Sequence, residues 1–224
     1  MGVRAALTAG ETRVIACLIE KQITTPDQYP LSLNALTNAC NQKSNRDPVM
    51  ALPESEVQQL VDSLVRKHFV MERSGFGSRV PKFQHCYCNT EFASLKFTPQ
   101  ELAIVCELML RGPQTAGELR TRAARMAPFV DGAEVERALE ALAARAEGAL
   151  VQRLPRQPGR REARYAQLLS GALPDEWLAA VDTPQAAPAN GTADRDAWAA
   201  HVDAEIRRLS DEVAELRARL LSST

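Results

Sequence analysis

Ten basic side chains lie around two turns and one polar loop, where they could bind phosphate groups. Five flank a Gly/Pro turn near residue 158, three flank a similar turn near residue 77, and two lie in the loop over residues 41–48. A guanidinium group can donate two parallel hydrogen bonds to one phosphate, and each neutralised phosphate adds salt-dependent affinity for nucleic acid. The candidate nucleic-acid-binding residues are Lys43, Arg46, Arg73, Arg79, Lys82, Arg153, Arg156, Arg160, Arg161 and Arg164.

Acidic residues in two predicted helices oppose this interpretation. Carboxylates repel phosphate, yet they crowd the helices that would have to enter a DNA groove. Two alternatives therefore stay open: the charged residues only solvate helix and hairpin surfaces, or these surfaces bind a protein partner. The acidic residues are Glu54, Glu56 and Asp62 in one helix and Asp131, Glu134, Glu136 and Glu140 in the other.

The run His85-Cys86-Tyr87-Cys88 invites a metal-site interpretation. In a strand, alternation places Cys86 and Cys88 on one face. A zinc ion needs further ligands, and the sequence has no second pair at C-x₂-C or H-x₃-H spacing. We therefore expect no metal and no cofactor, but a buried strand with an apolar cysteine face and reduced thiols throughout.

The sequence offers poor support for catalysis. No Ser or Cys nucleophile has a credible base nearby in the sequence, and the three histidines are His68, His85 and His201. Gly75-Phe76-Gly77 is too short to cradle a phosphate, and no G-x-x-x-x-G-K-[ST] motif is present. We therefore expect that the protein is not an enzyme.

A repeated unit supplies the elements that would position the basic residues. Leu7–Ile19 is echoed ninety positions later by Phe97–Met109, and Val57–Leu64 is echoed seventy-eight positions later by Val135–Leu142. In each copy, apolar residues at i, i+3/i+4 spacing predict three helices. Two strands joined by a glycine-containing turn are predicted to follow them. This is the element order of a winged helix, a helix-turn-helix variant.

The repeat therefore predicts a mostly α protein with small β-hairpin wings, an α+β fold with two tandem winged-helix domains over residues 1–94 and 95–170. Each domain is expected to fill its own small interior. In the first copy we expect helices over 11–22, 33–40 and 54–65 and strands over 69–73 and 82–87. In the second we expect helices over 99–110, 115–126 and 132–146 and strands over 150–154 and 162–167.

The last part of the chain changes character twice. Residues 171–193 are rich in Ala, Pro, Gly and Thr, which predicts a flexible linker with at most one short turn near 175–181. Residues 194–224 repeat apolar side chains four and three positions apart, as a coiled-coil-like helix does, and we expect a homodimer. The alternative is a helix that folds back on its own domains or binds a neighbouring protein. The candidate dimerisation residues are Val202, Ile206, Leu209, Val213, Leu216 and Leu220.

Composition and charge are those of an ordinary globular protein. The 224 residues are 45% hydrophobic and 25% charged, with a net charge of −1. Residues 95–170 carry 12 basic and 9 acidic side chains, whereas residues 171–224 carry 5 and 10. No apolar run is long enough for a membrane span and no signal peptide pattern is present, so we expect a cytoplasmic protein without a membrane partner.

Several motifs resemble the signature of the YceH family, bacterial proteins of unassigned function. The resemblance covers about residues 8–170 and implies tandem winged helices. It implies no enzyme activity, cofactor or established site. The motifs are Glu20-Lys21, Thr24-Thr25-Pro26, Tyr29-Pro30-Leu31-Ser32-Leu33-Asn34-Ala35-Leu36 and Ala39-Cys40-Asn41-Gln42-Lys43-Ser44-Asn45-Arg46-Asp47-Pro48-Val49.

Two functions remain compatible with these observations. The first is a non-enzymatic DNA-binding or transcription-regulatory factor that contacts the phosphates of double-stranded DNA through basic wings. The second is a protein–protein scaffold or adaptor without direct nucleic-acid binding, which the uncharged loop Gln28–Leu31 and the heptad tail would suit.

Overall fold

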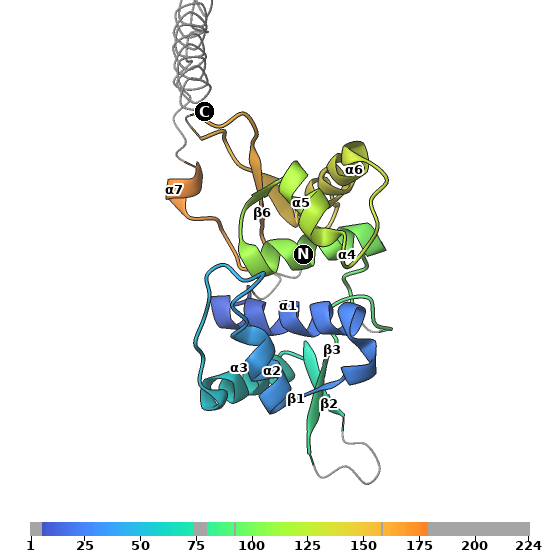
Figure 1. Ribbon diagram of the computed structural model, residues 1–224, viewed down its shortest axis with the longest axis vertical. Coiled ribbons are helices and arrows are strands. Elements are labelled where there is room, and N and C mark those ends of the chain that lie inside the picture. The colour runs from blue at the N-terminus through green and yellow to red at the C-terminus, as the bar shows by residue number, and fades with distance from the viewer. Residues whose placement is uncertain (1–5, 74–79, 92, 158, 179–224) are drawn as a thin grey trace, which may run out of the picture. The chain divides into compact units, whose positions relative to one another are not determined.

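The computed structural model describes residues 6–73, 80–91, 93–157 and 159–178 (Figure 1). These residues form a mixed α+β fold with seven α-helices and two small antiparallel sheets. Arg79, most of the expected linker and all six candidate dimerisation residues lie outside the described residues. None of the described helices is long and apolar enough to cross a membrane.

The first half contains three α-helices followed by two longer strands, as the repeat predicts. Its elements are α1 (Ala9–Thr24), the 3₁₀-helix η1 (Pro26–Gln28), β1 (Leu31–Ser32), α2 (Leu33–Cys40), α3 (Glu54–Arg66), β2 (Val70–Arg73) and β3 (Lys82–His85). A capping box starts α1, because the Thr8 hydroxyl accepts a hydrogen bond from Glu11 N and the Glu11 carboxylate accepts one from Thr8 N. The Ser32 hydroxyl caps α2 in a similar way.

The second half repeats this order in a shorter segment. Its elements are α4 (Pro99–Arg111), β4 (Gln114–Thr115), α5 (Ala116–Ala123), α6 (Gly132–Ala143), β5 (Val151–Arg153), β6 (Arg164–Gln167) and α7 (Asp175–Leu178). Capping boxes at Thr98 and Thr115 start α4 and α5. The helix α7 is the short turn expected near residues 175–181.

Each hairpin acquires a third strand that the sequence analysis did not predict. The strand orders are β1-β3-β2 and β4-β6-β5, with Leu31 opposite Phe83 in one sheet and Gln114 opposite Tyr165 in the other. Two-residue strands are too short to show an alternating apolar pattern, which explains why β1 and β4 were missed. They tie the start of α2 and of α5 to the hairpins.

One ion pair occupies the same place in both halves. Lys67 Nζ lies 2.7 Å from Glu11 Oε1, and Arg145 Nη2 lies 3.0 Å from Glu101 Oε2. The two carboxylates stand ninety positions apart and the two cations seventy-eight, which are the offsets of the sequence repeat. Each ion pair connects the end of the third helix to the start of the first helix in its half. The two halves therefore repeat this contact as well as the order of helices and strands.

The two halves meet where α1 and α4 pack side by side (Figure 1). The Cys106 thiol donates to the Ala16 carbonyl at 3.3 Å, and these residues are also ninety positions apart, so the helices meet at equivalent positions. Glu11–Glu20 and Glu101–Leu110 are buried without a break. Instead of the two separate interiors we expected, one continuous cluster of buried side chains spans both halves. The bounds of two domains at 1–94 and 95–170 stay a prediction.

Candidate nucleic-acid interface

The hairpin of the second half carries all five arginines that the sequence analysis assigned to it. Arg153 ends β5 and Arg164 begins β6, and the other three lie in the connection between these strands. Leu154 is buried and its backbone N–H donates to the carbonyl of Arg164 at 2.7 Å, which continues the strand pairing beyond β5. This buried base fixes the direction in which the exposed arginines project.

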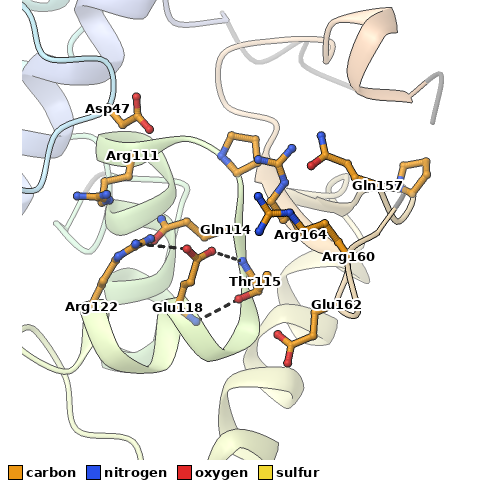
Figure 2. Close-up of a pocket in the computed structure, with 12 residues that line it drawn as sticks. Asp47, Arg111, Gln114, Thr115, Glu118, Arg122, Gln157, Arg160, Glu162 and Arg164 are labelled. Atoms are coloured by element: carbon orange, nitrogen blue, oxygen red, sulfur yellow. Dashed lines mark hydrogen bonds and ion pairs between the residues drawn. The ribbon is translucent and has the colours of Figure 1, made fainter. Parts of the chain in front are cut away.

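Arg160 and Arg164 line a hollow of about 400 Å³ together with arginines from two helices (Figure 2). We call it the first hollow. Arg111 comes from the end of α4 and Arg122 from α5. Arg122 donates to Gln114 Oε1 at 2.6 Å, and its Nη2 lies 3.3 Å from Glu118 Oε1. The acidic residues of the lining are Asp47, Glu118 and Glu162.

A second hollow of about 290 Å³ adjoins the first and shares Glu162 with it. Its arginines are Arg120 of α5 and Arg153, Arg156 and Arg161 of the hairpin, and its other carboxylate is Glu136. The two hollows thus bring together eight arginines and four acidic residues. We refer to these eight as the arginine face: Arg111, Arg120, Arg122, Arg153, Arg156, Arg160, Arg161 and Arg164.

Most of this positive charge has no counter-ion in the part of the chain that the structure describes. Arg122 is the one member of the arginine face with a carboxylate within 4.0 Å there. Like charges gathered in a concave surface raise the local potential and attract anions. The arrangement is therefore suited to a ligand with several negative charges at intervals, such as a phosphate backbone.

The sequence analysis missed three members of the arginine face. Arg111, Arg120 and Arg122 lie on helices far along the chain from the hairpin turn, so their proximity to it is a product of the tertiary fold. The one sequence feature that pointed to two of them was the pair of basic residues, Arg120 and Arg122, in the last turn of α5.

The basic candidates of the first half lie further apart. Arg73 stands opposite Lys82 in the pairing of β2 with β3, and both side chains are exposed. Lys43 is exposed in the loop after α2. These three residues line none of the hollows described above, and no helix adds arginines beside them in the way that α5 does for the second hairpin.

Arg46 corrects the sequence analysis, because its side chain is not at the surface. It is 4% exposed, and its Nη1 and Nη2 donate to the two carboxylate oxygens of Glu20 at 3.1 and 2.5 Å. Its Nε donates to the Ala39 carbonyl. These bonds occupy the guanidinium group, so Arg46 is withdrawn from the nucleic-acid-binding candidates.

Arg46 belongs instead to a network that joins the two halves. Arg125 Nη2 lies 2.6 Å from Glu20 Oε1 and 3.2 Å from Glu107 Oε2, and Asn45 donates to the same Glu107 oxygen. We call Glu20, Arg46, Glu107 and Arg125 the ion network. Burial would raise the pKa of Glu20, but the hydrogen bonds and charges of Arg46 and Arg125 hold it below its usual value.

The expected buried cysteine face is also wrong for one residue. The strand β3 ends at His85, and it is His85, Tyr87 and Cys88 that are buried, whereas Cys86 is half-buried. The His85 ring forms a 2.6 Å hydrogen bond with Gln22, and burial lowers its pKa to about 4. Among the described residues, no group of three or more His, Cys, Asp or Glu side chains could hold a metal ion.

Fold and site together define an α+β protein in which one unit of three helices and a hairpin occurs twice, with arginines gathered on the second copy. A family model described as "Protein of unknown function, DUF480" matches residues 7–160, and the chain belongs to this family. A UPF0502 protein of Vibrio vulnificus (strain YJ016) is 54% identical over 216 residues, which cover 96% of this chain and 97% of the relative.

Two further relatives are similar over almost the same length. The UPF0502 protein YceH of Escherichia fergusonii is 51% identical over 214 residues, covering 96% of this chain and 94% of the relative. A UPF0502 protein of Citrobacter koseri is 52% identical over 214 residues, with the same coverage of both chains. The resemblance to the YceH family is therefore confirmed, and it extends into the last part of the chain.

Proposed function

We propose that this chain is a non-enzymatic tandem winged-helix protein of the cytoplasm that binds double-stranded DNA through the arginine face of its second half. The order of three helices and a hairpin in each half, with a short third strand before the second helix, supports the winged-helix assignment. Pairing of the heptad segment into a homodimer would place two arginine faces in one assembly and raise avidity without new contacts.

The observation that carries the proposal is the gathering of eight arginines on two adjoining hollows. Among the described residues, Arg122 is the one of these eight that forms an ion pair. Guanidinium groups bind phosphate through paired hydrogen bonds, and each contact releases a counter-ion from DNA. Because the arginines come from two helices and a hairpin, one extended ligand could contact several of these elements at once.

The acidic third helix limits how the DNA can lie. The exposed side of α6 carries Glu136 and Glu140, its N-cap is Asp131, and its first turn carries Glu134. A duplex would therefore approach along α5 and the hairpin, with Glu140 and the start of α6 turned away from the phosphates, although Glu136 lines the second hollow. Contacts of this kind position a protein on DNA and carry little sequence information, so we expect weak sequence preference.

The test is the salt dependence of binding to a fluorescein-labelled duplex of about 20 base pairs, followed by fluorescence anisotropy. With five or more phosphates neutralised, the logarithm of the binding constant should fall with a slope of roughly −4 or steeper against the logarithm of the salt concentration. Absence of binding at about 50 mM salt, or a slope near zero, would refute phosphate binding by the arginine face.

A protein scaffold or adaptor is the second candidate function, and exposed apolar side chains on the first half favour it. Met71 on β2 is 40% exposed, Val80 just before β3 is 55% exposed, and Val65 at the end of α3 is also exposed. Exposed apolar side chains of this kind can contribute to a protein contact surface. A pull-down from native cytosol with and without nuclease separates the two functions, because a DNA-mediated complex is lost on nuclease treatment and a direct protein complex is not.

A further inference from the structure

A groove of about 580 Å³ lies beside the contact of α1 with α4; it is more apolar than the arginine face and shares Arg111 with it. Its floor includes Leu7, Leu108 and Met109, which are almost fully buried. Its rim includes Leu173 and Trp177, and the Trp177 side chain is 36% exposed. We call this hollow the apolar groove.

The wall formed by the segment after β6 is attached to α1 by hydrogen bonds. Leu7 N donates to the Leu169 carbonyl at 3.1 Å, and the hydroxyls of Thr12 and Ser170 are 2.8 Å apart. The groove is therefore formed by fixed elements of the fold, and its volume falls within the range of about 300 to 1,000 Å³ that is usual for small-molecule sites.

Two arginines with unsatisfied donors line this apolar surface. Arg13 is 2% exposed and donates to the carbonyls of Cys40 and Pro48, but it has no carboxylate within 4.0 Å among the described residues. Arg111 is half-buried, and within the same described ranges none of its side-chain nitrogens has a hydrogen-bond partner. The Nε atoms of both arginines are buried without a partner.

The charge of these two arginines is only partly balanced. Asp47 also lines the groove, but its side chain is exposed and lies beyond ion-pair distance of both guanidinium groups. Burial lowers the pKa of Arg13 and the neighbouring positive charge of Arg46 adds to this effect, while Asp47 partly offsets it. Removing a guanidinium from water is costly unless an anion or several acceptors replace the water.

We propose that the apolar groove binds a small amphipathic carboxylate, a molecule with an apolar chain or ring and one carboxylate group. The apolar floor would cover the chain or ring, and Arg111 would receive the carboxylate while Arg13 supplies positive charge from beneath. The apolar lining disfavours a highly charged phosphate ester or nucleotide, whose polar groups would lose water without replacement. This inference does not depend on the proposed function.

The experiment uses the full-length chain with Trp198→Phe, which leaves Trp177 as the sole tryptophan. Sodium decanoate and 1-decanol are matched probes, because they share the apolar chain and differ in the carboxylate. We expect decanoate to change Trp177 emission saturably and to bind at least about tenfold more tightly than decanol, the difference that a charge-assisted hydrogen bond produces. Calorimetric titration provides a second readout of the same binding.

Two variants and a control locate the site. Arg111→Gln should weaken decanoate binding to the level of decanol, and Ala172→Phe, at an exposed position in the groove lining, should prevent binding of both probes. Arg137→Gln, an exposed arginine on α6 outside the groove, should leave both affinities unchanged. Equal binding of the two probes, unchanged decanoate binding in Arg111→Gln, or no saturable signal in either readout would overturn the proposal.

Discussion

The two hairpins occupy the same place in their sheets but have different surfaces. In the first, Arg73 faces Lys82 across the strands, and α2, the counterpart of α5, carries no basic residue. In the second, five arginines lie between residues 153 and 164, and α5 adds two more. The capping boxes of α1 and α4 and the repeated ion pair are alike in the two halves, whereas the exposed charges of the hairpins are not. The two copies thus share one fold, while the exposed arginines are concentrated on the second.

The polar loops that follow α2 and α5 have also diverged. In the loop over residues 41–48 the Arg46 side chain turns inward and binds Glu20, and Asp47 N donates to the Leu110 carbonyl of the second half. Arg125, just beyond α5, meets the same Glu20 from the other side. The loop that resembled a phosphate-binding loop in sequence is therefore a structural joint between the halves.

The largest expected effect concerns this joint. Arg46→Met should lower the free energy of unfolding by about 3 kcal/mol or more, because it leaves the buried Glu20 carboxylate short of its main partner. Urea denaturation followed by circular dichroism measures the loss. Lys43→Met in the same loop is the matched control and should stay within about 0.5 kcal/mol of wild type, since Lys43 is exposed. Equal stabilities of the two variants would show that the loop is not a joint.

The next effect is a pH dependence that the first half should produce, because His85 in that half is buried and His68, the other described histidine, is exposed. Its pKa is about 4 in the folded protein and about 6.5 when unfolded, so between these values the unfolded state binds the extra proton. Stability should therefore be fully present above pH 6.5 and fall by up to about 3 kcal/mol as the pH drops to 4.

Denaturation curves at several pH values test this expectation. His85→Gln should flatten the fall between pH 6.5 and 4, whereas His68→Gln, at an exposed position, should retain it. A fall of the same size in both variants would assign the acid sensitivity to other groups.

Removing positive charges from each hairpin in turn tests which of the two hairpins binds DNA. The triple variant Arg153→Gln, Arg156→Gln and Arg161→Gln should weaken duplex binding roughly a hundredfold at about 0.1 M salt and reduce the salt slope by about 3. The double variant Arg73→Gln and Lys82→Gln should change affinity by less than about threefold, since these residues lie outside the arginine face. Comparable losses from the two variants would mean that both hairpins bind DNA.

The smallest effect should be the same in both halves. Thr8→Ala and Thr98→Ala each remove the hydroxyl of a capping box and should each cost about 1 kcal/mol of unfolding free energy. Denaturation curves of the two single variants give the comparison. A difference of more than about 1 kcal/mol between them would show that the repeated helices do not contribute alike.

Much of the fold could be predicted from the sequence, because helix caps, helices and hairpins depend on residues that are close together in the chain. Thr8 and Thr98, each three residues before a glutamate, mark helix starts, and the five arginines around residue 158 lie within one short segment of the sequence. The burial of Arg46 could not be predicted, since polar loops usually lie at the surface and its partner Glu20 is 26 positions away. The unbroken apolar run Val14–Ile19 did contain a signal that α1 is enclosed on all sides.

The meeting of α1 and α4 at equivalent residues has a consequence for how this architecture can vary. Two identical subunits must present the same patch to each other, so every substitution at such a contact occurs twice. Here both patches belong to one polypeptide, and Ala16 and Cys106 can differ although they face each other. Because the two copies are covalently joined, dilution cannot dissociate them as it can a dimer. A substitution in one copy can therefore change that copy alone while the other copy stays in contact with it.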